Sequence, residues 1–242
     1  MKENAFFQKI FSCSSLSHLK GSLLLEEDQQ VHFYQGEANK CLQLEHDFFH
    51  RRLETKEWID LAGSPPNGLV FIGCLNNEII LDVVEPIHLG LVSSFHIFKN
   101  KQKCHLSIDH YQILRHNCQN QGIGTECFYR QLNKSLELNF SQILTKTSRK
   151  PEENGYYTWP RFGFNAKLPG RIIRSLPTTI NYSKTLLHLM ETETGRLWWR
   201  NHGVGLKLTF DLSPESDSLR CFEKYYFSKK NSFGKNEFIN AN

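Results

Sequence analysis

A glycine-containing turn near the middle of the chain carries the residue pattern with the clearest chemical meaning. Gly122 and Gly124 lie in the run Gln-Asn-Gln-Gly-Ile-Gly-Thr, between an expected strand and an expected helix. Glycine lets a ligand approach the backbone closely, and a helix N-terminus presents N–H groups and a positive dipole end. The pattern therefore predicts a cradle for a pyrophosphate group. Its expected members are Gln119, Asn120, Gln121, Gly122, Ile123, Gly124 and Thr125.

Two common phosphate-binding loops do not fit this run. A Walker A loop needs Gly-Lys followed by Ser or Thr, whereas Gly124 is followed by Thr125 and Glu126. A dinucleotide-binding fingerprint needs a third glycine, and Cys127 occupies that position. Both readings are disfavoured, and an ordinary strand-to-helix turn stays as the plain alternative to a coenzyme loop.

A strand, the turn, a helix and a second strand must position the cradle. A strand is expected over 105–114, and apolar positions on one face predict a helix over 125–138. Ile143 and Leu144 mark a short strand after that helix. This succession is typical of a βαβ unit.

Further elements are expected on both sides of this unit. Two aliphatic runs around Asn76-Asn77 predict a hairpin, and Ser213 followed by Pro214 predicts a helix start. The expected upstream elements are a strand over 31–34, a helix over 37–61, strands over 69–75 and 78–84, and a looser strand over 89–98. The expected downstream elements are a helix over 183–200, a strand over 206–212 and a final helix from Ser213 to about Lys229.

Two motifs together resemble the GNAT superfamily of N-acetyltransferases. Gln119, Gly122 and Gly124 match the Q/R-x-x-G-x-G/A pattern of that family's acyl-CoA loop. Further on, the run Tyr156–Phe164, which ends in Gly-Phe, resembles the family's Y-x-x-x-G-F ending. The resemblance covers about residues 30 to 170.

The resemblance implies an α/β fold, in which a mixed sheet is splayed open at its middle and flanked by helices. It divides the chain into a lead-in over 1–30, a GNAT-like acyl-CoA-binding domain over 31–170 and a C-terminal extension over 171–242. Acetyl-CoA, as a co-substrate, would lie in the splay. Backbone N–H groups of 121–125 would hold its pyrophosphate, and the strand end near Leu114 would pair with the pantetheine amides.

The family's reaction is direct attack of an amine on the thioester, assisted by a base and an acid. Asp109 and His110 lie on the strand before the turn, where the family's bases often occur, and strand alternation lets at most one of them face the cleft. Trp159 stands where the family's acidic Tyr falls, so Tyr156 or Tyr157 would have to replace it, and Tyr157 is taken as the candidate acid. An indole N–H is not an acid, so coenzyme binding is better supported than catalysis.

Three functions therefore stay open. The leading one is transfer of an acetyl group from acetyl-CoA to an amine acceptor, which is a small molecule or a protein group. The second is a non-catalytic acyl-CoA-binding module, and the third is a protein-interaction module that keeps only the fold. The C-terminal extension would close over the acceptor side or make a homodimer.

Composition and scattered residues argue against other classes. The chain has 242 residues and a formal net charge of +4, which falls short of a dedicated nucleic-acid binder. No apolar run is long enough for a membrane span, and no secretory signal is expected.

Seven cysteines without a CxxC pair indicate reduced thiols in the cytoplasm and no metal site. His46 and His50 are interpreted as a solvated helix face, and Trp198-Trp199 as core.

Overall fold

A computed structural model describes residues 30–34, 37–85, 91–113, 118–119, 121–150 and 153–237. The side chains of these residues are described up to residue 230. The chain forms two compact units, Met1–Phe140 and Ser141–Asn242. Both units combine helices with strands, so the chain is a mixed α/β protein, as the sequence predicts. The division falls inside the 31–170 segment, which therefore contributes residues to both units.

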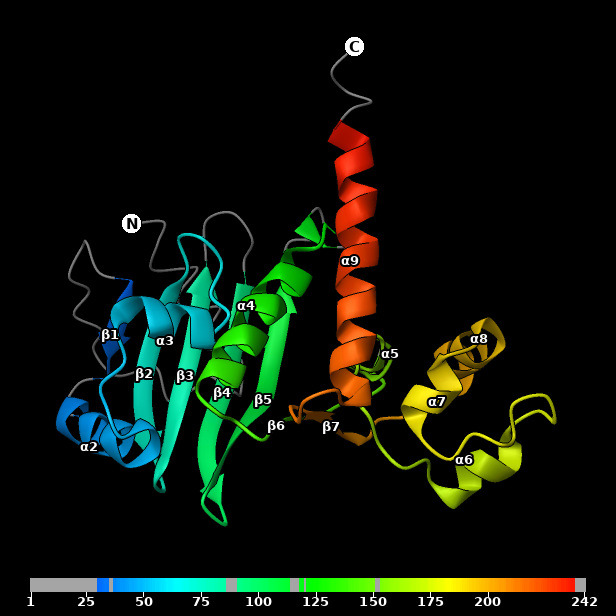
Figure 1. Ribbon diagram of the computed structural model, residues 1–242, viewed down its shortest axis with the longest axis horizontal. Helices are drawn as coiled ribbons and strands as arrows, with labels where there is room; N and C mark the ends of the chain where they lie inside the picture. The colour runs from blue at the N-terminus through cyan, green and yellow to red at the C-terminus, as the bar shows by residue number, and fades with distance from the viewer. Residues whose placement is uncertain are drawn as a thin grey trace. The chain divides into compact units, whose positions relative to one another are not determined.

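The first unit is built on five strands in the order β1-β2-β3-β4-β5 (Figure 1). β1 pairs with β2 in parallel, and the later pairs in this unit are antiparallel. Each of these strands lies within two residues of a predicted one, so the predicted strands of this unit are confirmed. Their bounds are β1 (Val31–Phe33), β2 (Leu69–Leu75), β3 (Glu78–Glu85), β4 (Leu91–Asn100) and β5 (Lys103–Ile113).

The hairpin between β2 and β3 shows why that prediction succeeded. Asn76 and Asn77 have φ values of 50° and 64°, the left-handed conformation that a two-residue hairpin turn needs and that asparagine tolerates. Leu75 and Glu78 pair directly across the turn. The local chemistry of two asparagines therefore fixes the register of two buried strands.

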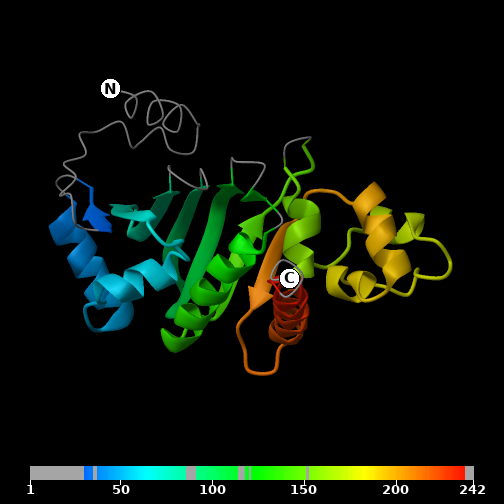
Figure 2. The same ribbon diagram turned by 90° about the horizontal axis from the view of Figure 1, so that it is seen from above.

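Three helices cover one face of this sheet (Figures 1 and 2). They are α2 (Ala38–Phe49), α3 (Thr55–Leu61) and α4 (Ile123–Glu137), the last of which confirms the helix predicted after the turn. The single helix predicted over 37–61 is wrong, because its path breaks at His50. That residue is left-handed, with φ 57°, and ends α2. Glu54 and Glu57 then form a capping box that begins α3.

The second unit combines an antiparallel strand pair with short helices and one long helix. Asn165 extends the pair through an isolated bridge to Thr209. The bounds are β6 (Gln142–Lys146), α5 (Gly155–Arg161), α6 (Gly170–Ser175), α7 (Leu186–Met190), α8 (Glu193–His202), β7 (Lys207–Asp211) and α9 (Asp217–Glu237). Across the described part of the chain, none of the helices has the length and apolar character needed to cross a membrane.

Two helix predictions in this unit need correction. The helix predicted over 183–200 is split into α7 and α8, because the Thr192 hydroxyl accepts the N–H of Gly195 and caps a new helix. The final helix begins at Asp217 rather than beside the predicted cap, Ser213. The Ser213 hydroxyl turns back to the end of β7 instead of capping the helix.

Candidate functional site

The predicted cradle lies at the N-terminus of α4. Gly122 stands at the N-cap with φ 82°, a left-handed conformation that favours glycine. The first intrahelical bond runs from the N–H of Glu126 to the Gly122 carbonyl, so the N–H groups of 123–125 precede it. The N-cap residue is a glycine, so it has no side chain of its own to cap this terminus. The helix therefore directs a group of N–H donors and its positive dipole end towards the turn.

The start of the turn is tied back to the strand that precedes it. The Gln119 side-chain amide donates to the carbonyl oxygen of Ile113, the last residue of β5, at 2.8 Å. The strand end expected to pair with pantetheine therefore already has this carbonyl engaged. Gln119 and Gln121 are exposed, whereas Leu114 and Asn120, two further predicted members of the site, lie outside the described residues.

Beneath the turn, the side chains come from the face of β5 that α4 covers. A Cβ built on Gly124 would lie 3.5 Å from the Tyr111 ring, which is an ordinary contact distance. The Tyr111 hydroxyl is buried, and burial is the main cause that raises its pKa, with the neighbouring Cys127 thiol as a further cause. Burial likewise raises the pKa of the Cys127 thiol. Tyr111 and Cys127 therefore place uncharged groups under the turn.

An extra residue in β5 decides where the candidate bases point. Consecutive residues of β4 pair with Ile108 and His110, which leaves Asp109 between them as a β-bulge. The Asp109 carboxylate bonds to His96, and by register His96 and His110 lie on the same face of the sheet. Asp109 and His110 therefore share a face, and the prediction that alternation separates them is wrong.

Asp109 belongs to a chain of charged groups that crosses three strands. His96 Nε2 lies 3.0 Å from Asp109 Oδ2, and His96 Nδ1 lies 3.0 Å from Glu78 Oε2. The Ser107 hydroxyl donates to the other Asp109 oxygen at 2.9 Å. Each ring nitrogen of His96 therefore faces one carboxylate. The array thus fixes the orientation of the Asp109 carboxylate on a partly exposed face.

The candidate acid, Tyr157, lies in the second unit, on α5. The Arg161 guanidinium lies over the Tyr157 ring, 5.5 Å from its centre. Trp159 makes edge contacts with Phe162 and Phe164, at centroid distances of 5.7 and 5.0 Å. Trp159 is therefore part of an aromatic cluster, and the Tyr157 ring makes a cation–π contact with the Arg161 guanidinium.

The Gly-Phe ending of the second motif has a packing reason. Gly163 has φ 105°, and a Cβ there would lie 2.3 Å from the Ser218 carbonyl oxygen. Phe164 is fully buried, and its ring centre lies 5.3 Å from that of Phe210. Pro160 lies inside α5, which has seven residues, in agreement with the shortened helix that the missing N–H predicts.

The interpretation of His46 and His50 is confirmed, and that of Trp198-Trp199 as core is confirmed for Trp199 alone. His46 and His50 are both exposed, as expected of a solvated helix face. Trp199 is fully buried, and its indole N–H donates to the Tyr156 carbonyl at 2.8 Å. Trp198, its neighbour, is half-buried and stacks on a histidine ring of the same helix.

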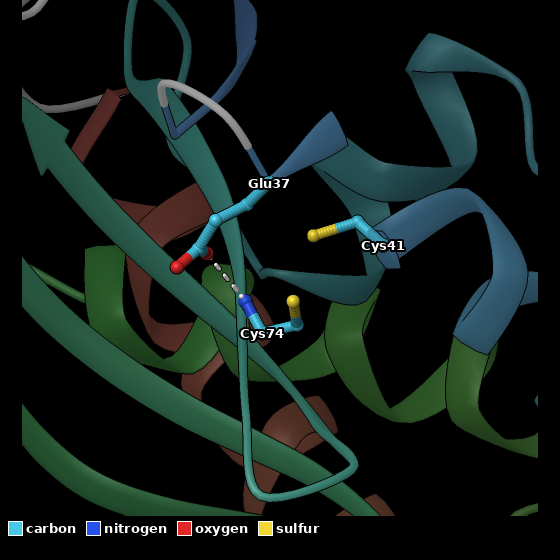
Figure 3. A group of neighbouring side chains, drawn as sticks. All are labelled: Glu37, Cys41 and Cys74. Atoms are coloured by element: carbon cyan, nitrogen blue, oxygen red, sulfur yellow. Dashed lines mark hydrogen bonds between the residues drawn. The ribbon is translucent and has the colours of Figure 1, made fainter. Parts of the chain in front are cut away.

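Sequence reasoning misses one cluster of potential metal ligands in the first unit. Cys41 Sγ, Cys74 Sγ and a carboxylate oxygen of Glu37 all lie within 4.8 Å of one another (Figure 3). Both thiols are buried. Burial and the adjoining Cys74 raise the pKa of the Cys41 thiol to about 12. Glu37 and Cys41 are one helical turn apart, but Cys74 comes from a distant strand, so no spacing pattern announces the cluster.

Comparison with known proteins was made for the whole chain. No protein-family model matches it, and no curated protein matches its sequence. The GNAT resemblance therefore depends on the two motifs, and the function drawn from it is a proposal.

Proposed function

We propose that the protein is an acetyl-CoA-dependent N-acetyltransferase of the GNAT type. The observation that carries the proposal is the turn into α4, where Gly122 is left-handed and the N–H groups of 123–125 precede the first helical bond. The chain order β5, turn, α4, β6 and α5 is also the order that the resemblance implies. The splayed sheet expected of the family is part of this proposal.

The residues of the turn fit the pyrophosphate of coenzyme A. A pyrophosphate needs several converging N–H donors and a backbone that it can approach closely. The first turn of α4 supplies the donors, and Gly122 and Gly124 put no side chain in the way. When bound, acetyl-CoA supplies the activated thioester. The chain's own residues would hold it in place and move protons.

The groups at the β-bulge are the candidates for proton transfer. Acetyl transfer forms a C–N bond and breaks the thioester C–S bond, while the amine loses a proton and the leaving thiolate gains one. Both carboxylate oxygens of Asp109 are already engaged, one by the His96 ring and the other by the Ser107 hydroxyl, so neither is directed at an incoming amine. His110 lies on the same face and is therefore the better candidate base. Asp109 then acts as a positioning residue.

Calorimetric titration of acetyl-CoA into the full chain tests the coenzyme site. Gly124→Ala and Gly124→Glu are matched variants, because a Cβ at this position makes only an ordinary contact with Tyr111. Wild type and Gly124→Ala should bind alike. Gly124→Glu should bind about 100-fold more weakly, because its carboxylate would repel the pyrophosphate. A folded wild type that does not bind acetyl-CoA would overturn the proposal.

Turnover is then measured by mass spectrometry of the products from a panel of amines. A polyamine, an amino acid, a peptide N-terminus and a peptide lysine would represent the acceptor classes. His110→Ala should lower kcat by about 100-fold, the usual contribution of a general base. Asp109→Asn should lower it less. Equal losses in both variants would contradict the roles given to these two residues.

Trp159 favours a second function, in which acyl-CoA binds without transfer. This residue stands at the family's acid position, has no acidic proton, and packs against Phe162 and Phe164. Trp159→Tyr adds a hydroxyl, and Trp159→Phe is its matched control. The second function predicts coenzyme binding without turnover in the wild type and a gain of activity in the Tyr variant alone. Turnover by the wild type, unchanged in the Tyr variant, would support the transferase.

A further inference from the structure

We propose that Glu37, Cys41 and Cys74 form a Zn²⁺ site that joins the start of α2 to β2. One ligand atom of each side chain lies within 4.8 Å of the ligand atoms of the other two (Figure 3). Among the described residues, no other group of three histidine, cysteine or carboxylate side chains converges in this way. This site is separate from the proposed coenzyme site and does not depend on it.

The fold brings the three residues together from two elements. Glu37 is the N-cap residue of α2, and Cys41 lies one turn further on, so both side chains project from the same side of the helix. Cys74 is the penultimate residue of β2, on the sheet face that also carries the buried Val70 and Ile72. The helix covers this face and sets Cys41 opposite Cys74.

The Glu37 carboxylate is held in place by the strand itself. β1 ends at Phe33, and Tyr34 makes the next backbone bond to β2, through its N–H to the Ile72 carbonyl. Beyond that point Glu37 Oε2 accepts the N–H of Cys74 at 2.8 Å. The carboxylate thus takes the place of a neighbouring strand. It is already positioned and oriented before any metal binds.

Gly73 makes room for this arrangement. A Cβ at Gly73 would lie 3.0 Å from Glu37 Oε2 and 2.5 Å from Tyr34 Cδ2. Any larger residue would therefore displace the carboxylate or the aromatic ring beside it. The absence of a side chain at Gly73 is therefore a second observation, independent of the cysteines. It leaves open the space beside the strand that the Glu37 carboxylate occupies.

The donor set points to zinc among the common metal ions. Thiolate sulfur suits borderline-soft and soft ions and disfavours Mg²⁺ and Ca²⁺, which take oxygen ligands. Zn²⁺ binds cysteine together with carboxylate, and three protein ligands leave its fourth tetrahedral position for water. Buried cysteines can also serve as small apolar side chains. Here, however, an oxygen ligand that already accepts the Cys74 N–H lies beside the two thiols, and together they make a mixed sulfur and oxygen donor set.

Titration with Co²⁺ tests the site on the full chain, reduced and stripped of metal. One equivalent should produce the thiolate-to-metal charge-transfer absorption and the visible bands of tetrahedral cobalt, and Zn²⁺ should then displace it. Cys41→Ser and Cys74→Ser should each lose the charge-transfer signal or bind at least about 100-fold more weakly. Cys104→Ser is the matched control, because Cys104 is also buried but belongs to no such cluster.

Glu37→Gln separates the ligand role of the carboxylate from its structural role. The amide oxygen can still accept the Cys74 N–H, but the side chain loses the negative charge that a metal ion favours. The affinity should fall about 10-fold to 100-fold while the metal-free protein stays as stable as the wild type. An unchanged affinity in this variant would overturn the three-ligand site.

Two further outcomes decide the proposal. If the wild type gives no tetrahedral cobalt spectrum at one equivalent, or if Cys41→Ser and Cys74→Ser keep that spectrum, there is no zinc site here. If either serine variant fails to fold, ¹¹³Cd NMR of the wild type replaces it, since the cadmium shift reports how many sulfur ligands are bound. A shift typical of two sulfurs supports the site, and one typical of oxygen ligands alone overturns it.

Discussion

The two units of this chain have cores of different kinds. The core of the first unit is largely aliphatic and comes from its strands, and its fully buried members include Ile72, Ile79, Leu81, Val83, Ile97 and Leu106. The core of the second unit combines aliphatic side chains with a cluster of aromatic rings. Phe164 lies edge-on to Trp159 and to Phe210, with ring centres 5.0 and 5.3 Å away, and Trp199 is fully buried as well.

This difference explains where chemistry can be placed. Aliphatic strands bury their side chains by simple alternation, so a single irregularity such as the bulge at Asp109 brings two polar groups to one face. In an aromatic cluster each ring is fixed by the angle of its neighbours, so Trp159 packs rather than reacts. The better-supported candidate residues of this chain therefore lie in the first unit.

The largest expected effect comes from removing a ring from the core of the second unit. Trp199→Ala should lower the free energy of unfolding by about 3–5 kcal/mol, because it removes a buried ring and its hydrogen bond to Tyr156. Urea unfolding measures the loss, and hydrogen exchange locates it. Protection should fall first within 141–237. The half-buried neighbour Trp198 is the control, and its alanine variant should cost about 1 kcal/mol. An equal loss of protection in both units would contradict two separate cores.

The two glycines of the candidate cradle should respond in opposite directions. Gly122→Ala should lower the free energy of unfolding by about 1–2 kcal/mol, because φ 82° is unfavourable for a residue with a Cβ. Gly124→Ala should raise it by about 0.5–1 kcal/mol, because alanine is the better helix former and Tyr111 leaves room for it. Urea unfolding of both variants checks this. The same sign in both would mean that the turn differs from the one described.

Acid titration should distinguish the polar contacts of the first unit from the aromatic contacts of the second. Glu57 accepts two hydrogen bonds from Arg51 and lies 3.5 Å from Lys134, and these contacts lower its pKa from 4.5 to about 2. A lowered folded-state pKa means that the contribution to stability is present above pH 4.5 and is lost as the pH falls towards 2. The difference in Tm between wild type and Glu57→Gln should therefore shrink as the pH falls from 4.5 towards 2. The control is Arg161→Gln in the second unit, whose Tm gap should stay constant because its ring contacts do not titrate in that range. A Glu57→Gln gap that persists at pH 2 would sink this explanation.

The smallest expected effect on stability is at the exposed array. Asp109→Asn should change the free energy of unfolding by less than about 1 kcal/mol, because the pair with His96 is partly exposed. The ¹⁵N shifts of the His96 ring should nevertheless move, since one of its two charged partners is gone. High salt should reduce the stability difference further. Unchanged ring shifts would show that the array does not hold the imidazole in solution.

The strands and the turn into α4 could be predicted because their signals are local. β-Branched and aliphatic runs and the Asn-Asn turn are each readable over a few residues. The break at His50 was missed because the apolar periodicity of 37–61 continues through it. The left-handed His50 ends α2 and the capping box of Glu54 and Glu57 begins α3, so local backbone and capping chemistry overrides the helical pattern.

The candidate site was predicted in part. The turn and the helix after it were predicted, and Gly122 at that turn has the left-handed conformation that favours glycine, whereas binding of a coenzyme by Gln119 and its neighbours stays a prediction. The bulge did leave a trace: the inward residues of β5 are Cys104, Leu106 and Ile108, and then Tyr111 and Ile113, so the alternation changes from even to odd at Asp109. The cluster of Glu37, Cys41 and Cys74 has no comparable signal in the sequence, because these residues come together only when α2 packs on β2.

The bulge in β5 also determines how this chain can vary in length. Deleting Asp109 would restore a regular ladder in which His110 keeps its partner on β4, so every later side chain would keep its face. Inserting a residue elsewhere in β5 would shift the pairing by one and turn Tyr111 away from α4. A single-residue deletion should therefore preserve the strand register at position 109, although it removes the Asp109 carboxylate, and should disrupt the register at the positions of the strand before it.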